Sequence, residues 1–181
     1  MNKKALLIID MQNGSFTAKT PRYDTEGVVS RINALARRFR HLQDPVIFIQ
    51  HDGSGTNEFI PGTKTWALLD SLETYTSDLC INKYANDVFY NSNLKPTLDT
   101  LGVDTLYITG CATDFCVAAT IQSAITKNYN LTIVADGHTT GERPNLNAKQ
   151  VIDHYNWVWK NMIPTKGQVT VKDFKGIMQS L

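Results

Sequence analysis

The stretch "TLYITGCATDFCVAAT" (Thr105–Thr120) places a short apolar run directly before a helical pattern, and this succession recurs along the chain. The run Thr105–Thr109 is typical of a buried strand, and a helix is expected from about Asp114 to Lys127. Strands that alternate with helices predict a parallel sheet with helices on both of its faces. Because ligands of such folds bind at the carboxyl ends of the strands, the residues that follow each strand are the candidates for chemistry.

The same patterns predict the other elements of the chain. Strands are expected at Ala5–Ile9, Pro45–Gln50, Leu79–Asn82 and Leu131–Ala135. Helices are expected at Glu26–Leu42, Leu94–Leu101 and Ala148–Met162. The segment "QVTV" (residues 168–171) lies near the end of the chain. The polar stretch His51–Thr65 predicts a long loop of a kind that is usually functional or mobile. We therefore expect one α/β domain over residues 1–181, with three layers and a mostly parallel sheet of about six strands.

Composition and charge argue against several classes of protein. A formal net charge of +1 gives no strong field, so neither nucleic acid nor a membrane is expected as a partner. The segment Met1–Lys4 is followed by a run of five apolar residues, which is too short for a signal peptide or a membrane span. With three cysteines, an odd number, reduced thiols and a cytoplasmic location are expected.

Two of the cysteines, Cys111 and Cys116, lie five residues apart in the opening stretch. This spacing fits neither a usual zinc site nor a C-x-x-C redox pair. Cys80 and Cys111 are expected to be small buried hydrophobic residues. Cys116 falls in the first turn of the predicted helix, where the helix dipole and unpaired N–H groups favour a thiolate. We expect a lowered thiol pKa and a nucleophilic Cys116, with a buried structural cysteine as the alternative.

Two further polar residues follow predicted strands and could act together with this thiol. Asp10 follows Ala5–Ile9, and Lys83 follows Leu79–Asn82. Taken alone, Asp10 could cap a turn and Lys83 could be solvated. Together with Cys116, the carboxylate can take the thiol proton and the ammonium can keep the carboxylate ionised. These are the parts of a nucleophile, base and orienting group.

Three motifs together resemble those of a known family. "IIDMQNGSF", "INKYANDVF" and "GCATDFCVAAT" occur in this order. They resemble the isochorismatase-like cysteine hydrolases, with nicotinamidase and N-carbamoylsarcosine amidase as relatives, over essentially the whole chain. The resemblance implies a Rossmann-like strand order, an Asp10-Lys83-Cys116 triad and a homo-oligomer. It also implies a cis peptide between Cys111 and Ala112, with the N–H groups of Ala112 and Cys116 as oxyanion donors.

The resemblance weakens at the metal site of nicotinamidases, which is built from an Asp-x-His pair and a further histidine. The corresponding region reads "QHDGSGTNEF", with Ser54 two residues after Asp52. We therefore expect no metal and no cofactor, and nicotinamide becomes doubtful as a substrate. His51 could contribute to the site, although a histidine at a strand end is more often a hydrogen-bonded structural group, and His138 is interpreted in the same way.

The substrate pocket is expected to have partly apolar walls suited to a small amide. The candidates lie near the three motifs and strand ends, and each could equally belong to the core: Phe16, His51, Trp66, Tyr84, Phe89 and Phe115.

Three functions follow from these expectations. The first is a metal-independent cysteine hydrolase that cleaves an amide-like C–N bond through a thioester, with a small molecule and water as substrates. The second is an isochorismatase-type vinyl-ether hydrolase in which Asp10 acts as the acid. The third is a non-catalytic small-molecule binding protein, since a fold alone does not guarantee a function.

Overall fold

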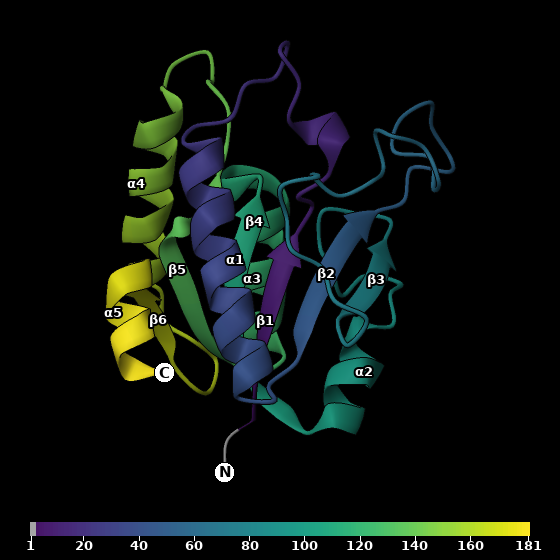
Figure 1. Ribbon diagram of the computed structural model, residues 1–181. Helices are drawn as coiled ribbons and strands as arrows, with labels where there is room; N and C mark the ends of the chain where they lie inside the picture. Colours follow the sequence, from purple (N-terminus) through teal and green to yellow (C-terminus); the bar gives the residue numbers. More distant parts are fainter. Residues whose placement is uncertain (1–2) are drawn as a thin grey trace.

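All six strands of the sheet run in parallel, in the order β3-β2-β1-β4-β5-β6 (Figure 1). The computed structural model describes residues 3–181, so Met1 and Asn2 of the segment Met1–Lys4 lie outside the described residues. The strands are β1 (Lys3–Ile9), β2 (Val46–His51), β3 (Leu79–Lys83), β4 (Val103–Cys111), β5 (Asn130–Thr139) and β6 (Val169–Lys172). The predicted α/β sheet of about six strands is confirmed.

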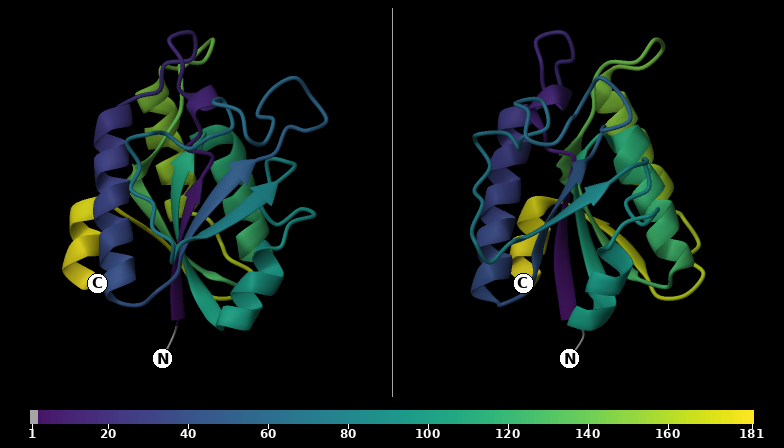
Figure 2. Two further views of the ribbon diagram at one scale, coloured as in Figure 1. Left: turned by 45° about the vertical axis from the view of Figure 1, so that its right-hand side comes forward. Right: turned by 90° about the vertical axis from the view of Figure 1, so that its right-hand side faces the viewer.

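Helices cover both faces of this sheet, which gives the three expected layers (Figure 2). One face carries α1 (Thr25–His41) and the short α5 (Phe174–Ser180). The other carries α2 (Leu94–Leu101), α3 (Ala118–Thr126) and α4 (Ala148–Lys160). Within residues 3–181, none of the helices combines the length and the apolar character that crossing a bilayer requires.

The central strand β1 explains why the core forms on both sides of the sheet. Its side chains alternate between the faces, so that Leu7 and Ile9 join the cluster under α2, α3 and α4. Leu6 and Ile8 join the cluster under α1. All four are fully buried, as expected for a parallel strand covered on both faces, and such strands have unbroken apolar sequences.

Element boundaries differ from the predictions mainly at the carboxyl edge of the sheet. β5 continues to Thr139 because Cys111 of β4 still pairs with it beyond a register shift. The helix expected from Asp114 begins as a π-helical turn, Thr113–Val117, and becomes α3 only at Ala118. The predicted loop after β2 is also longer, since residues 52–78 contain no helix or ladder strand.

The expectation for Cys80 was wrong, because this residue is exposed. It lies on β3, the edge strand of the sheet, which has a neighbour on only one side. The expectation for Cys111 is confirmed, since its side chain is buried in the cluster under α1.

Gly110 allows the two central strands to approach each other where the candidate site begins. It pairs with Ile9 and has a φ of +123°. A Cβ atom at this position would lie 2.1 Å from the Ile9 carbonyl oxygen. Only glycine fits this backbone and this contact.

Replacing Gly110 with alanine is therefore expected to lower the free energy of unfolding by more than about 3 kcal/mol, through steric overlap and a disfavoured φ. Gly55→Ala is the control, because its new Cβ would meet nothing within 4 Å. It should change stability by less than about 0.5 kcal/mol. Urea unfolding of both variants measures the difference, and equal midpoints would contradict this account of the β1–β4 contact.

Candidate active site

Three polar side chains meet at the carboxyl edge of the sheet. Asp10 follows β1 directly, and its amide donates to the Ile49 carbonyl of β2 at 2.9 Å. Lys83 is the last residue of β3, and Cys116 lies in the π-helical turn after β4. Parallel strands end at one edge, so residues that are far apart in the sequence become neighbours here. The structure brings together all three residues of the predicted triad.

The ammonium of Lys83 is the centre of this arrangement. Its Nζ lies 2.8 Å from Oδ2 of Asp10 and 3.4 Å from Sγ of Cys116. It also donates to the Ala85 carbonyl at 2.9 Å. Lys83 is only 1% exposed and Asp10 5%. Three acceptors therefore satisfy the three donors of a buried ammonium group.

The second oxygen of Asp10 has a different environment. Asp10 Oδ1 is buried and has no hydrogen-bond partner within residues 3–181. The thiol of Cys116 donates to Oδ1 of Asn86 at 3.5 Å and accepts from Lys83. The site thus pairs a protonated sulfur with a carboxylate oxygen that is free to accept a proton.

The pKa of the Cys116 thiol moves in the opposite direction to the one expected. The pKa of this thiol is raised to about 12. Burial is the largest cause, the negative charge of Asp10 also raises the pKa, and Lys83 lowers it. Burial lowers the pKa of Lys83, but Asp10 and Cys116 outweigh this effect, so the net pKa is raised. Lys83 favours a thiolate, as expected, but burial and the charge of Asp10 outweigh its effect. In the free protein Cys116 is therefore a thiol beside a cationic Lys83.

The backbone around Cys116 folds back on itself. The peptide between Cys111 and Ala112 is cis, and the N–H groups of Phe115 and Val117 both donate to the Ala112 carbonyl at 3.1 Å. Ala112 and Cys116 both line the cavity beside the thiol.

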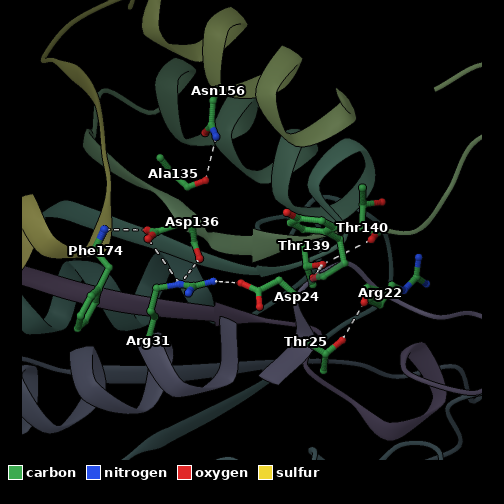
Figure 3. Close-up of polar contacts among 11 residues, drawn as sticks. Arg22, Asp24, Thr25, Arg31, Ala135, Asp136, Thr139, Thr140, Asn156 and Phe174 are labelled. Carbon is green, nitrogen blue, oxygen red and sulfur yellow. Dashed lines mark hydrogen bonds and ion pairs between the residues drawn. The ribbon is translucent and has the colours of Figure 1, made fainter. Parts of the chain in front are cut away.

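A buried hydrogen-bond chain holds this turn from behind. Thr113 Oγ1 lies 2.9 Å from His138 Nδ1, and His138 Nε2 lies 3.1 Å from Asn156 Oδ1. The amide of Asn156 in turn donates to the Ala135 carbonyl at 2.8 Å, which fixes its orientation (Figure 3). His138 therefore donates from Nε2 and accepts from Thr113 at Nδ1. The interpretation of His138 as a hydrogen-bonded structural group is confirmed.

A cavity of about 650 Å³ opens onto the thiol. Its floor includes Asp10, Ala112 and Cys116, and its walls come from the loops after β1 and β2 and from the turn before α3. A smaller adjoining cavity of about 140 Å³ reaches Lys83 and His51. The volume is in the range of sites for small molecules.

The structure places two of the six predicted pocket residues at these cavities. Phe115 lines the larger cavity and is 51% exposed, and His51 lines the smaller one. The other four aromatic candidates, which line neither cavity, are Phe16, Trp66, Tyr84 and Phe89.

Each of these four has another place in the fold. Phe16 packs against the core cluster under α1, and Phe89 is buried and stacked on Tyr129. The carbonyl oxygen of Trp66 accepts hydrogen bonds from the side chains of Gln12 and Gln50, and its indole nitrogen is buried. Tyr84 is 55% exposed and borders a separate surface hollow.

Three residues that sequence reasoning missed line the cavity in their place: Arg22, Phe59 and Asn86. Phe59 lies in the irregular segment after β2 and contacts His51 edge-on at a ring distance of 5.8 Å. Arg22 lies in the loop before α1, six residues beyond the end of the motif "IIDMQNGSF". Asn86 does lie within the quoted motif "INKYANDVF", which was the one available signal.

The residues after β2 do not fit a metal site of the nicotinamidase type. Asp52 Oδ1 accepts from the backbone N–H and the hydroxyl of Ser54 at 3.0 and 2.5 Å. Its Oδ2 accepts from Asn82 at 3.4 Å. This carboxylate therefore caps its own loop, and no cluster of three potential His, Cys, Asp or Glu ligands occurs in the described part of the chain.

Comparison with known proteins connects this geometry to a family. A family model described as an isochorismatase domain matches residues 4–165. The streptothricin hydrolase of Streptomyces noursei is 28% identical over 78% of this chain and 51% of its own length, so the match spans about half of that protein. The maleamate amidohydrolase of Pseudomonas putida is 25% identical over 80% of this chain and 78% of its own length.

A solved structure gives the same result for the fold. The crystal structure of an isochorismatase family protein matches with a TM-score of 0.85 at 30% identity. The match covers 94% of this chain and 98% of that one.

Burial of His138 makes stability depend on pH. Its pKa is lowered from 6.5 to about 4 in the folded protein, mainly because burial disfavours the charged ring. Between these values the unfolded chain binds a proton that the folded protein does not bind. The stabilisation is thus complete above about pH 6.5, and about 3 kcal/mol is lost as the pH falls to 4. Urea unfolding at several pH values should show a flatter profile for His138→Gln, and parallel profiles would contradict the assignment.

Replacing Asp10 with asparagine should lower the pKa of the Cys116 thiol, because it removes a negative charge and leaves Lys83 in place. The measurement is the pH dependence of alkylation by iodoacetamide, followed by peptide mapping, in a Cys80→Ser background that removes the exposed thiol. Glu58→Gln is the control, since this carboxylate is exposed at the cavity wall. An unchanged or higher midpoint in Asp10→Asn would contradict the electrostatic account.

Proposed function

The chain belongs to the isochorismatase family of hydrolases, and we propose that it is a metal-independent cysteine hydrolase that cleaves an amide-like C–N bond of a small molecule. The observation that carries the proposal is the contact of one buried ammonium, Lys83 Nζ, with both Asp10 and Cys116. The amidohydrolase named among the relatives supports this type of bond. The cavity of about 650 Å³ supports a small substrate.

The first half of the reaction forms a thioester. Asp10 accepts the thiol proton of Cys116, and the sulfur attacks the carbonyl carbon of the substrate. The oxyanion that develops is stabilised by the N–H groups of Ala112 and Cys116. When the tetrahedral intermediate collapses, the C–N bond breaks, and the proton held by Asp10 passes to the leaving nitrogen.

The second half releases the acid. Water enters the site vacated by the amine and loses a proton to Asp10 as it attacks the thioester carbon. The C–S bond then breaks, and the proton returns from Asp10 to the sulfur of Cys116. Lys83 remains cationic throughout, so it stabilises the thiolate in both halves without exchanging a proton.

The high pKa of the free thiol is compatible with this sequence of steps. The mechanism requires no thiolate in the free enzyme, because the thiol stays protonated until the carboxylate takes its proton. Asp10 lies beside the sulfur, and its Oδ1 is without another partner among residues 3–181. Proton transfer and attack can therefore be concerted, with Lys83 at 3.4 Å from the sulfur on which charge develops.

The test is turnover of small primary amides, followed by ammonia release. Cys116→Ala and Asp10→Asn are each expected to lower kcat/KM by at least about 10³-fold, since each removes one member of a unit that acts together. Cys80→Ala, on the outer edge strand, should retain the wild-type value.

The ether-hydrolase alternative predicts a different pattern for the same variants. Turnover of isochorismate that survives Cys116→Ala but is lost in Asp10→Asn would select that alternative and overturn the proposal. The homo-oligomeric state and the cytoplasmic location remain predictions.

A further inference from the structure

Arg22 brings a positive charge to the cavity without a carboxylate partner. It lines the same cavity as Cys116, and it takes part in none of the ion pairs formed within residues 3–181. Burial raises the pKa of the Cys111 thiol, and the charge of Arg22 is the largest effect that opposes this rise. Arg22 and Cys111, the residue that precedes Ala112, line the same cavity.

Hydrogen bonds to the backbone hold the loop at Arg22 and at the residue that follows it. Thr25 Oγ1 donates to the Arg22 carbonyl at 3.1 Å. The next residue, Tyr23, donates to the Thr140 carbonyl at 3.0 Å and accepts from the Thr139 hydroxyl at 2.6 Å. In Figure 3 the side chain of Arg22 points away from the Asp24–Arg31 ion pair, which lies on the opposite side.

The guanidinium itself is oriented by one bond that leaves its two terminal nitrogens available. Nε donates to the Ser15 carbonyl at 2.8 Å. Nη1 lies beside Gly141, where a Cβ atom would come within 3.1 Å of it. Because Gly141 has no side chain, the ends of the guanidinium are not covered from this direction. The two terminal nitrogens form the fork that binds a carboxylate with two parallel hydrogen bonds.

The two other cations near the thiol that are buried or partly buried already have carboxylate partners. Arg143 donates to both oxygens of Asp114, at 2.6 and 2.9 Å, and lies over the Phe115 ring. Lys83 is paired with Asp10. Lys19 and Glu58 also line the cavity, but both are exposed to solvent, which screens their charges. Arg22 is thus the partly buried charge that this cavity leaves uncompensated.

We propose that the substrate carries a carboxylate in addition to its scissile amide, and that Arg22 binds this carboxylate. The inference rests on the proposed function for the amide and adds the chemical class of the rest of the molecule. The substrate would be a small amide of a dicarboxylic acid, or another amide with an anionic group at the far end. Arg22 is then a specificity-determining residue that takes no part in the proton transfers.

The test compares three amides of equal chain length: succinamate, the neutral 4-oxopentanamide and the cationic 4-aminobutanamide. Malonamate and glutaramate vary the distance between the two groups. Wild-type protein is expected to turn over at least one monoanionic amide with a kcat/KM at least about 10-fold above that of the neutral and cationic compounds. Arg22→Gln should lower this value by about 10- to 100-fold for the anion, mainly through KM, and leave the neutral amide within about 2-fold.

Two further variants separate charge from positioning. Arg22→Lys keeps the charge but cannot form the same fork, so it should recover part of the preference for the anion. Arg37→Gln removes an arginine outside this cavity and should leave the preference unchanged. An equal loss for anionic and neutral amides in Arg22→Gln would indicate a structural role and overturn the inference.

Binding without turnover distinguishes this inference from the proposed function. In Cys116→Ala, calorimetry should show succinamate or one of its homologues binding at least about 10-fold more tightly than the neutral amide, with the difference lost on adding Arg22→Gln. If the anions bind through Arg22 but the wild type hydrolyses no amide, the proposed function fails and the inference stands. If neutral amides are hydrolysed and Arg22→Gln has no effect on any compound, the inference fails and the function stands.

Discussion

A buried contact between an ammonium and a carboxylate ties together strands that are not neighbours in the sheet. Lys83 ends β3 and Asp10 follows β1, with β2 between them, yet their charged atoms lie 2.8 Å apart. Removing both charges from water costs several kcal/mol per ion, so such a pair persists only when every remaining donor is satisfied. Ala85 and Cys116 complete the set around Lys83. A buried pair of this kind is weak evidence for stability. In the proposed mechanism it supplies the base and the positive charge beside Cys116.

The parallel sheet supplies the geometry for that contact. Ile9 and Gly110 face each other in register, so Asp10 and the turn that carries Cys116 leave adjacent strands at the same level. The His138 chain then fixes the turn from the opposite side. Within residues 3–181, Lys83 and Arg143 near the thiol are paired with carboxylates, whereas the partly buried Arg22 forms no ion pair and leaves the cavity with a positive charge.

The sequence was most informative where a pattern follows from local geometry. Buried parallel strands have continuous apolar runs, so β1 and the residue after it, Asp10, could be located without a structure. The exposure of Cys80 could not be predicted in this way, because it depends on β3 being an edge strand. The direction in which the pKa of Cys116 shifts could not be predicted either, because it depends on burial and on a carboxylate that follows another strand. Arg22 and Phe59 come from irregular segments, where no periodicity indicates which side chains face the cavity.

The proposed mechanism requires a thioester between the substrate and Cys116, and partitioning with hydroxylamine tests for this intermediate most directly. Amides of one acyl group with different leaving amines are hydrolysed in the presence of hydroxylamine, and the ratio of hydroxamate to free acid is measured. A common acyl-enzyme predicts the same ratio for every leaving amine. A ratio that changes with the leaving amine, or the absence of hydroxamate during turnover, would contradict the covalent mechanism.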